Sequence, residues 1–327
     1  MTVPRTDRNI ASTKEINLND AYQESIMTKL SILAYADDKD KDFREQIRAY
    51  GKKLPERFSE VLKEIVNKEN LTLKQLSKKF NYSDKQFRVW RSGKAGIPLN
   101  LLIAVWQAVG KNLEELENLI EEIGVYGSDK IKPPKQLTLE LAEIIGRHCG
   151  DGCCIKSSKD YRVTLTEHKS LIDLHNKQLK EIFDIHAKKR KITNEIYISI
   201  VNSKTYHRFF THVIKIPAGK KAKTVKEPQI IKEAGVEFRK RFVRGLIDTE
   251  GSVYNANRQT ILQISLKSPF LINSILEILK EIGLNSYVYH YKDVFTLRLF
   301  GKKQVQKYFE LIGTSSKKWK SIFPGNR

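Results

Sequence analysis

The chain has 327 residues, and 59 Lys and Arg against 38 Asp and Glu give a formal net charge of +21. Hydrophobic residues make up 40% of it, enough for a sizeable core, so wholesale disorder is excluded. Three cysteines are too few for a disulfide framework, and no apolar run is long enough to cross a bilayer. The length predicts two or three domains, and the basic composition favours a polyanion as partner.

The excess positive charge is unevenly distributed. Residues 51–155 carry 17 basic and 14 acidic side chains, whereas residues 156–250 carry 22 and 11, and residues 251–327 carry 12 and 4. Solvated lysine-rich faces are common, but a bias over half the chain favours a nucleic-acid surface there. The N-terminus lacks the apolar segment of a signal peptide, so we expect a cytoplasmic, nucleoid-associated protein.

The first third of the chain divides into an arm and a helical domain. Residues 1–50 are polar without core periodicity, so we expect a mobile arm or loose helices. From residue 54 apolar residues recur at helical spacing. Thr72 and Ser83 are candidate caps of two short helices around a tight turn, and Pro98 opens a further apolar helix. This order is the helix-turn-helix plan, and we place this all-α domain at residues 51–128.

The segment from Leu71 to Gly110 resembles the lambda-repressor and Cro-like helix-turn-helix family, including its tryptophan and its Gly-x-x-x-Ile-Pro exit. The resemblance implies that the helix starting at Ser83 enters a major groove, where Lys85, Gln86 and Arg88 face bases or phosphates. A bundle used for dimerisation or docking is the alternative. Residues 129–136, rich in lysine and proline, are predicted to be a linker.

Beyond the linker the chain repeats itself at an offset near 99 residues. Asp151 lies in Gly-Asp-Gly and Glu250, 99 residues later, lies in Thr-Glu-Gly. The segments that start at Ile196 and Phe295 follow the same offset. Each copy is predicted to fold as helix, two strands, helix, two strands, helix. We place the copies at residues 137–236 and 237–327, an α+β fold with pseudo-twofold symmetry.

Each copy opens with an apolar helix that ends at an acid followed by glycine. Small residues recur four apart on one face of each helix: Gly146 and Gly150, Gly245 and Thr249. Such faces let two helix backbones approach closely, which would bring Asp151 and Glu250 together. Two adjacent carboxylates are costly to keep ionised unless they share divalent cations, and Mg²⁺ is the usual choice beside substrate phosphates.

Both motifs resemble those of the LAGLIDADG homing endonucleases, in the form with two copies on one chain. The second copy, Val243–Gly251, is close to the motif that names the family, and the first, Ile144–Gly152, is more divergent. The resemblance spans roughly residues 137–320 and implies a duplicated αββαββα fold. It also implies a monomeric, site-specific endonuclease that hydrolyses both strands of duplex DNA across the minor groove, with Mg²⁺ or another divalent cation bound by Asp151 and Glu250.

By the same resemblance, lysines of two loops stabilise the charged transition state. The candidates are Lys221, Lys223 and Lys318. The family often carries a water-organising glutamine on the second strand of each copy. Strand alternation places Thr166 and Ser265 there, or Glu167 and Leu266 if the alignment slips by one, so neither pair contains glutamine.

In this family the strands read DNA from the major groove, and polar side chains alternate along them here. The candidate DNA contacts are Arg162, Thr164, Thr166, Lys189, Arg190, Gln263, Ser265 and Arg298. Tyr197, Ser199 and Thr296 are predicted to alternate in the same way. The solvated surface is the alternative for each residue alone. The cysteines and His148 beside the first acid are interpreted as packed core rather than metal ligands.

Three hypotheses remain for the function. The favoured one is a free-standing, single-chain endonuclease whose helix-turn-helix assists binding to double-stranded DNA; the chain ends lack the splice-junction residues of an intein. The second is a non-cleaving transcriptional regulator on the same fold, favoured by the appended domain and the missing glutamine. The third is an RNA maturase that binds intron RNA. The two acids favour cleavage.

Overall fold

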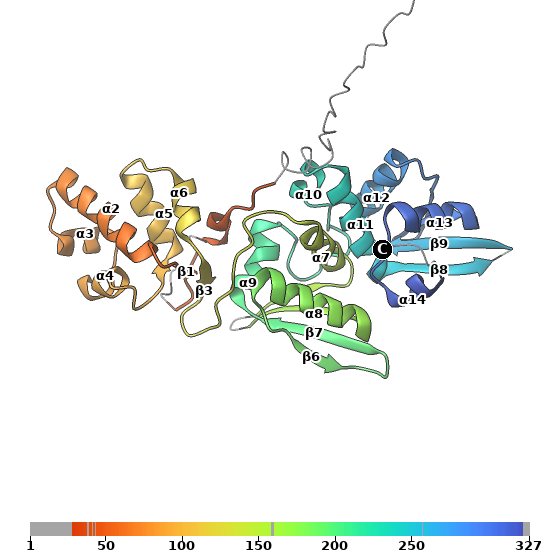
Figure 1. Ribbon diagram of the computed structural model, residues 1–327, viewed down its shortest axis with the longest axis horizontal. Helices are drawn as coiled ribbons and strands as arrows, with labels where there is room; N and C mark the ends of the chain where they lie inside the picture. Colours follow the sequence, from red (N-terminus) through yellow and green to blue (C-terminus); the bar gives the residue numbers. More distant parts are fainter. Residues whose placement is uncertain are drawn as a thin grey trace, which may run out of the picture.

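The structure is a computed structural model that describes residues 28–322, apart from 38, 41, 43, 158, 159 and 257; the side chains of 318, 321 and 322 are also not described. An N-terminal helical domain, the first repeat and the second repeat follow one another along the long axis (Figure 1). Most of the arm predicted at residues 1–50 lies outside the described residues. Within the described part of the chain, no helix is both long and apolar enough to cross a membrane.

The N-terminal domain consists of short helices, as the sequence predicts, and of a small sheet, which the all-α prediction lacks. Its helices are α2 (Leu54–Glu69), α3 (Leu73–Lys79), α4 (Asp84–Arg91), α5 (Leu99–Ala108) and α6 (Leu113–Leu119). Antiparallel strands lie in the order β2 (Ile97–Pro98), β1 (Arg48–Tyr50), β3 (Glu122–Gly124). Thr72 and Ser83 form capping boxes with Gln75 and Gln86, and Asn81 between α3 and α4 has a left-handed φ of 61°. Local capping chemistry therefore sets both helix starts where the sequence predicts them.

The described residues between 28 and 50, which we call the N-terminal strap, are folded against the rest of the molecule. The strap contains the 3-10 helix η1 (Ile32–Tyr35) and β1, and it buries Leu30 and Ile47 in the common core. The backbone amide of Leu137 donates to the carbonyl oxygen of Thr28 (2.9 Å). The sequence shows no periodicity here because these apolar residues are spread along an irregular segment and are buried by partners distant in sequence.

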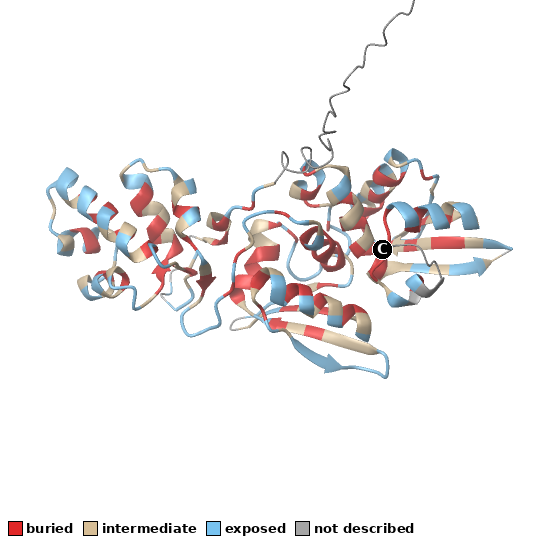
Figure 2. Ribbon diagram, in the orientation of Figure 1, coloured by how far each residue is buried: buried red, intermediate tan, exposed pale blue. Residues whose placement is uncertain are grey.

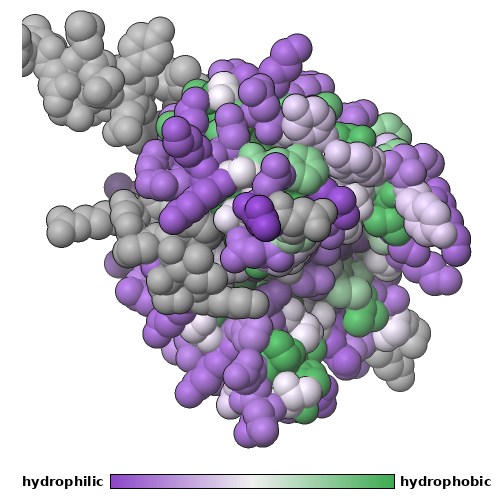
Figure 3. Space-filling model, turned by 90° about the vertical axis from the view of Figure 1, so that its right-hand side faces the viewer, coloured by the Kyte–Doolittle hydropathy of each residue, from purple (hydrophilic) through white to green (hydrophobic). Residues whose placement is uncertain are grey.

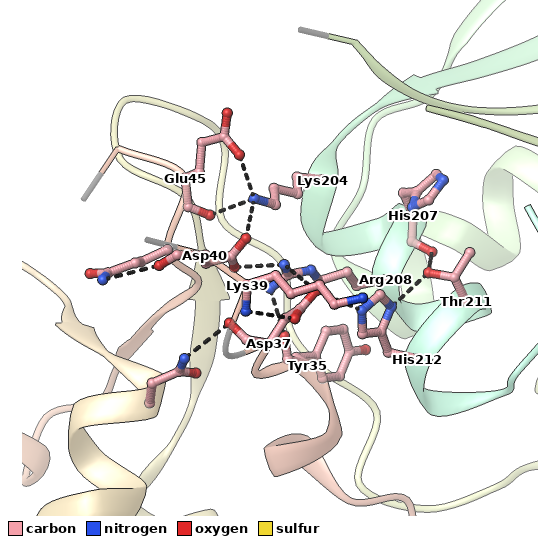
Figure 4. Close-up of polar contacts among 12 residues, drawn as sticks. Tyr35, Asp37, Lys39, Asp40, Glu45, Lys204, His207, Arg208, Thr211 and His212 are labelled. Atoms are coloured by element: carbon pink, nitrogen blue, oxygen red, sulfur yellow. Dashed lines mark hydrogen bonds and ion pairs between the residues drawn. The ribbon is translucent and has the colours of Figure 1, made fainter. Parts of the chain in front are cut away.

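An ion-pair cluster joins the strap to the first repeat (Figure 4). Lys204 Nζ lies 2.8 Å from Asp40 Oδ1, and Arg208 Nη2 lies 2.6 Å from Asp40 Oδ2. Arg208 also donates to the carbonyl oxygen of Tyr35 (2.9 Å). Lys204 and Arg208 are buried and the Asp40 side chain is only 8% exposed, so each charge depends on its partners for compensation.

The two repeats have the predicted order of elements. The first contains α7 (Leu139–Cys149), β4 (Cys153–Lys156), β5 (Tyr161–His168), α8 (Lys169–Phe183), β6 (Lys188–Lys191), β7 (Ile196–Asn202), α9 (Lys204–Arg208) and the π-helix η2 (Phe209–Val213). The second follows α10 (Gln229–Glu233) and contains α11 (Val236–Glu250), β8 (Gly251–Ala256), β9 (Gln259–Leu266), α12 (Pro269–Glu281), β10 (Tyr287–Tyr291), β11 (Val294–Phe300), α13 (Lys302–Leu311) and α14 (Lys317–Ile322). The α+β fold with two αββαββα copies is confirmed.

Each repeat has a four-stranded antiparallel sheet covered by helices on one side. The strand orders are β4-β5-β7-β6 and β8-β9-β11-β10. Val163 and Leu165 of β5, and Leu262 and Ile264 of β9, are buried beneath the helices. Residues that alternate with these point to the other side, which we call the open face of each sheet.

Helices α7 and α11 pack backbone to backbone at the centre of the duplicated half. A Cβ atom at Gly146 would overlap the carbonyl oxygen of Phe242, and one at Gly245 would overlap that of Glu143. Only glycine permits this approach, so the small-residue faces of the two motifs do bring the helices together.

The repeat offset changes from 99 to 98 residues between the second and fourth strands. The pairs in register are Thr166 with Ile198 in the first sheet and Ser265 with Thr296 in the second. Tyr197 and Ser199 therefore face the helices, not the open face as predicted. Ser199 is buried and its Oγ donates to Asn176 of α8 (2.6 Å). A constant offset was the wrong assumption, because the connection before β7 is one residue longer in the first copy.

Candidate active site

Asp151 and Glu250 meet where α7 and α11 end. A Cβ atom at Gly150 would lie 2.5 Å from Thr249 Oγ1 and 2.9 Å from Glu250 Cγ, so the two motif ends are in direct contact. The charge of Asp151 acts on Glu250 across this contact. One acid from each copy thus belongs to a single cluster, as the glycine spacing predicts.

Burial and mutual repulsion raise the pKa of the carboxyls in this cluster. The pKa of Glu250 rises to about 7, first because of burial and then because of Asp151. Burial also raises the pKa of Asp151, although a hydrogen bond with Glu167 and the charge of Lys221 oppose it. The cluster therefore holds negative charge at an energetic cost that a bound cation would relieve.

Glu167, at the end of β5, is a third carboxylate that strand alternation had assigned to the core side. Burial, with a smaller contribution from Asp151, raises the pKa of Glu167 to about 7. Thr166 points to the open face, so the alignment slipped by one is the one that reaches the acids. The counterpart of Glu167, 99 residues later, is the buried Leu266. Glu167 lies on the side of β5 that faces the helices, at the point where β5 passes the end of α7. The alternation of residues along one strand does not reveal this neighbour from another element.

Lys221 is the lysine that reaches the acids. Its Nζ donates to the carbonyl oxygens of Cys149 (2.9 Å) and Gly150 (2.6 Å), the last two residues before Asp151. Its charge lowers the pKa of both Asp151 and Glu250 against the effect of burial. Both contacts hold a positive charge beside the point where the two motifs meet.

Neither of the other two candidate lysines has a described contact with the acids. Lys223 is exposed and its Nζ lies 3.6 Å from Asp293 Oδ2. Lys318 lies in α14, and its side chain is not described. Of the two candidate lysines whose side chains are described, the structure therefore brings Lys221 to the acids.

The loop before α14 ties the two central helices together. Glu143 of α7 accepts hydrogen bonds from Arg147 and from Ser315 Oγ (2.5 Å). Burial alone would raise the pKa of Glu143, but Arg147 and then Arg244 hold it below its usual value. Asp248 of α11 accepts from the backbone amide of Ser315 (2.7 Å). The start of this loop is thus a structural clamp on α7 and α11.

A pocket of about 670 Å³ lies beside Glu250. The end of α7, residues 219–225 and the junction of β9 with α12 line it, and four lysines are among the lining residues: Lys220, Lys221, Lys223 and Lys267. Several cations around one carboxylate favour a phosphate as the occupant of this pocket.

The carboxylates fit a divalent cation whose coordination a substrate completes. Among the residues that the structure describes, no three His, Cys, Asp or Glu side chains are arranged to hold a metal ion by themselves. Asp151, Glu167 and Glu250 offer oxygen ligands, and Mg²⁺ is commonly bound by one or two carboxylates together with substrate phosphates and water. The uncompensated negative charge of the cluster favours the same kind of ion.

His148 and the neighbouring thiols belong to the core. Burial lowers the pKa of His148 to about 3 and raises the pKa of the Cys149 and Cys154 thiols to about 12. The thiols are therefore protonated and unsuited to metal binding at neutral pH.

Most predicted DNA contacts of the sheets lie on the open faces. They are Arg162, Thr164, Thr166 and Arg190 in the first sheet, and Gln263, Ser265 and Arg298 in the second. Lys189 differs: it pairs in register with Ser199, faces the helices, and lies within 2.5 Å of Asp173 on α8. The whole of β6 is nevertheless exposed at the edge of the sheet (Figure 2).

The three candidate contacts on α4 are unequal. Lys85 and Arg88 are exposed, and Arg88 forms an ion pair with Asp84. Gln86 Oε1 accepts from the backbone amide (2.8 Å) and the hydroxyl (2.9 Å) of Ser83. Because this carbonyl oxygen serves the capping box, the geometry does not favour Gln86 as a bidentate reader of adenine.

Sequence comparison finds a family match within the second repeat. Residues 237–313 match the family model described as "LAGLIDADG-like domain". The glutamine–fructose-6-phosphate aminotransferase [isomerizing] of Methanocaldococcus jannaschii is 24% identical over 92% of this chain and 27% of its own length. The tRNA-splicing ligase RtcB of Methanopyrus kandleri is 25% identical over 53% of this chain and 20% of its own length. The chain thus spans about a quarter or less of these relatives.

Several solved structures are similar at low identity. The homing endonuclease I-DmoI in complex with DNA and Mn is 18% identical, with a TM-score of 0.40, over 54% of this chain and 96% of that one. Meganuclease I-SmaMI bound to uncleavable DNA is 12% identical, with a TM-score of 0.38, over 54% and 85%. The N-terminal LAGLIDADG domain of DUF199/WhiA is 16% identical, with a TM-score of 0.36, over 55% and 86%.

Proposed function

We propose that this chain, whose second repeat is a LAGLIDADG-like domain, is a monomeric, site-specific DNA endonuclease that requires a divalent cation such as Mg²⁺. The observation that carries the proposal is the contact between the two motif ends, which joins Asp151 and Glu250 in one acidic cluster. The pseudo-twofold arrangement supplies one acid per copy, which suits two phosphodiesters on opposite strands of a duplex.

The residues of the cluster have distinct roles in this proposal. Asp151 and Glu250 hold the cation, which when bound supplies charge neutralisation and lowers the pKa of a water nucleophile. Lys221 stabilises negative charge that develops on the phosphate. Glu167 orients and deprotonates the attacking water on its own side, where its raised pKa makes it a competent proton acceptor near neutrality. Leu266 leaves the second side without such a group.

Duplex DNA lies along the open faces in this proposal. Arg162 and Arg190 of the first sheet and Arg298 of the second contact phosphates or base edges. The α3–α4 pair acts as a helix-turn-helix that adds contacts from Lys85 and Arg88. The duplicated half carries nearly all the excess charge and supplies most of the salt-sensitive affinity.

The test is cleavage of a duplex library, or of the flanking genomic DNA, by the purified protein with Mg²⁺ or Mn²⁺. We expect paired-strand cuts that disappear in Asp151→Asn and Glu250→Gln while binding is retained. Lys226→Ala is the matched control, because this exposed lysine belongs to the loop of Lys221, lies over the Phe270 ring and is not among the residues that line the pocket. Specific binding without cleavage by the wild type at every cation concentration would overturn the proposal.

The same experiment decides a second candidate, a non-cleaving transcriptional regulator. The observation that favours it is Leu266, because an apolar residue replaces the carboxylate in one half of the site. A regulator binds its target equally well in the wild type and both acid variants and cuts neither strand.

A further inference from the structure

Three exposed tyrosines form a row on the edge strand of the second sheet. Tyr287, Tyr289 and Tyr291 of β10 are 57%, 48% and 73% exposed. Tyr287 pairs in register with Arg298 of β11, and Tyr289 pairs with Thr296, so these side chains share the open face. The surface seen in Figure 3 is mostly hydrophilic, and a row of exposed rings on β10 therefore needs an explanation.

The row is continued by Phe300, which lies on the same face. Its ring centroid is 5.8 Å from that of Tyr287 and 6.5 Å from that of Tyr289. Alternate residues of a strand are separated by about 6.8 Å. This is twice the rise of roughly 3.4 Å per nucleotide in a stacked strand, so one planar base fits between neighbouring rings such as Tyr289 and Tyr291.

Cations are interleaved with the rings. The Arg298 guanidinium lies 5.3 Å from the ring centroid of Tyr289, and Lys292 Nζ lies 5.3 Å from that of Tyr291. Gln263 Oε1 accepts from Arg298 Nε (2.7 Å) and from the Tyr254 hydroxyl (2.9 Å), which fixes the arginine over the sheet. A surface that binds single-stranded nucleic acid combines aromatic rings, which stack on bases, with cations, which contact phosphates. Both kinds of group are present here.

The equivalent strand of the first sheet is different in kind. β6 has the sequence Lys-Lys-Arg-Lys and is exposed along its whole length. In register, Lys188 and Arg190 occupy the open-face positions that Tyr287 and Tyr289 occupy in β10. A duplex presents the same phosphates to both halves, so it explains the basic strand but gives no reason for the aromatic one.

We propose that the open face of the second sheet, at Tyr287, Tyr289, Tyr291 and Phe300, binds unpaired nucleotides by base stacking. The ligand is single-stranded nucleic acid, either RNA or a locally unpaired DNA strand. The surrounding positive charge favours this polyanion over a protein partner. The site does not depend on the acidic cluster, so its test is independent of cleavage.

The test is fluorescence anisotropy in EDTA with labelled single strands of about 12 nucleotides, as RNA and as DNA, and with the matching duplexes. We expect Tyr289→Leu to weaken single-strand binding roughly fivefold to a hundredfold, the loss of one stacking partner, and to weaken duplex binding by a clearly smaller factor. Tyr289→Phe keeps the ring and retains the affinity. Tyr126→Leu, which removes another exposed tyrosine in the N-terminal domain, leaves single-strand binding unchanged.

The comparison of RNA with DNA identifies the source of the strand, and either preference supports the proposal. Equal binding of single strands by the wild type and by a Tyr289→Leu, Tyr291→Leu double variant would overturn it. So would self-association in sedimentation that the double variant abolishes, because the rings would then belong to a contact between copies. A wild type that cleaves no DNA, but whose single-strand binding is weakened by Tyr289→Leu, would overturn the catalytic proposal and leave this one standing.

Discussion

At the scale of single residues, Glu250 shows what the acidic cluster costs the folded chain. The pKa of Glu250 is about 7 in the folded chain, against an ordinary value of 4.5. Between pH 4.5 and pH 7 the folded state therefore keeps a proton on Glu250 that the unfolded state has lost. The contribution of protonated Glu250 to the free energy of unfolding is therefore fully present below about pH 4.5 and is lost as the pH rises towards 7. Above pH 7 the ionised side chain opposes folding.

This predicts that Glu250→Gln raises the Tm at pH 8 by a few degrees and has little effect at pH 4. The rise corresponds to a gain of about 1–2 kcal/mol in the free energy of unfolding, after allowance for solvent screening. Differential scanning calorimetry at both pH values measures the effect. Mg²⁺ should raise the Tm of the wild type at pH 8 and leave the variant nearly unchanged. A variant less stable than the wild type at pH 8 without metal would contradict this origin of the raised pKa.

Lys221 provides the second prediction at this scale. Because its ammonium is held against the end of α7 beside both acids, Lys221→Ala is expected to lower the rate of cleavage about 100-fold, with little effect on DNA affinity. Lys226→Ala, five residues away in the same loop, should change the rate by less than threefold. Single-turnover cleavage with excess enzyme measures both, and equal losses would show that the loop acts only through its total charge.

At the scale of elements, the contact between α7 and α11 is the most restrictive in the molecule. Gly245→Ala puts a methyl group into the carbonyl oxygen of Glu143, so the helices must separate and the acids with them. We expect a loss of more than about 3 kcal/mol, or failure to fold, measured by urea unfolding. Glu237→Ala on the exposed side of α11 is the control and should cost under about 0.5 kcal/mol.

The central helices could be predicted because their information is local. The glycine spacing and the acids that follow it act within a few residues of their own position. The same is true of Thr72 and Ser83, which cap α3 and α4 in the N-terminal domain. The faces of β7 could not be predicted in this way, since the face of Ser199 depends on its register with β5, more than 30 residues earlier. Glu167 was assigned to the core for the same reason: the helix end that it meets comes from another element.

The fold of the N-terminal strap could not be predicted from local sequence patterns either. Its apolar residues have no period of their own, and Asp40 acquires its structural role only from Lys204 and Arg208, more than 160 residues later. A mixed-charge stretch resembles a solvated surface until its partners are known. Charge pairs between distant segments are what a single sequence reveals least.

At the scale of the whole molecule, this cluster attaches the N-terminal domain to the duplicated half. Arg208→Met should leave Asp40 and Asp37 less compensated and cost about 3 kcal/mol of stability. Limited proteolysis should then cut the segment between η1 and β1 faster than in the wild type. Glu45→Gln, which alters a half-exposed member of the same cluster, is the control with little expected effect. Unchanged protection of this segment in Arg208→Met would show that the apolar contacts of the strap suffice.

The distribution of the +21 charge gives the last prediction, which concerns affinity for duplex DNA. Each phosphate neutralised by a lysine or arginine contributes about 0.9 to the slope of log K against log salt concentration. The exposed Arg190 lies on the strongly basic first sheet, whereas Lys85 lies on a domain whose charges nearly balance. Arg190→Ala should therefore reduce the slope by about 0.9, and Lys85→Ala by clearly less. Equal reductions, measured by anisotropy titration between low and physiological salt, would mean that the N-terminal domain is a full partner in the electrostatic binding of DNA and not an auxiliary contact.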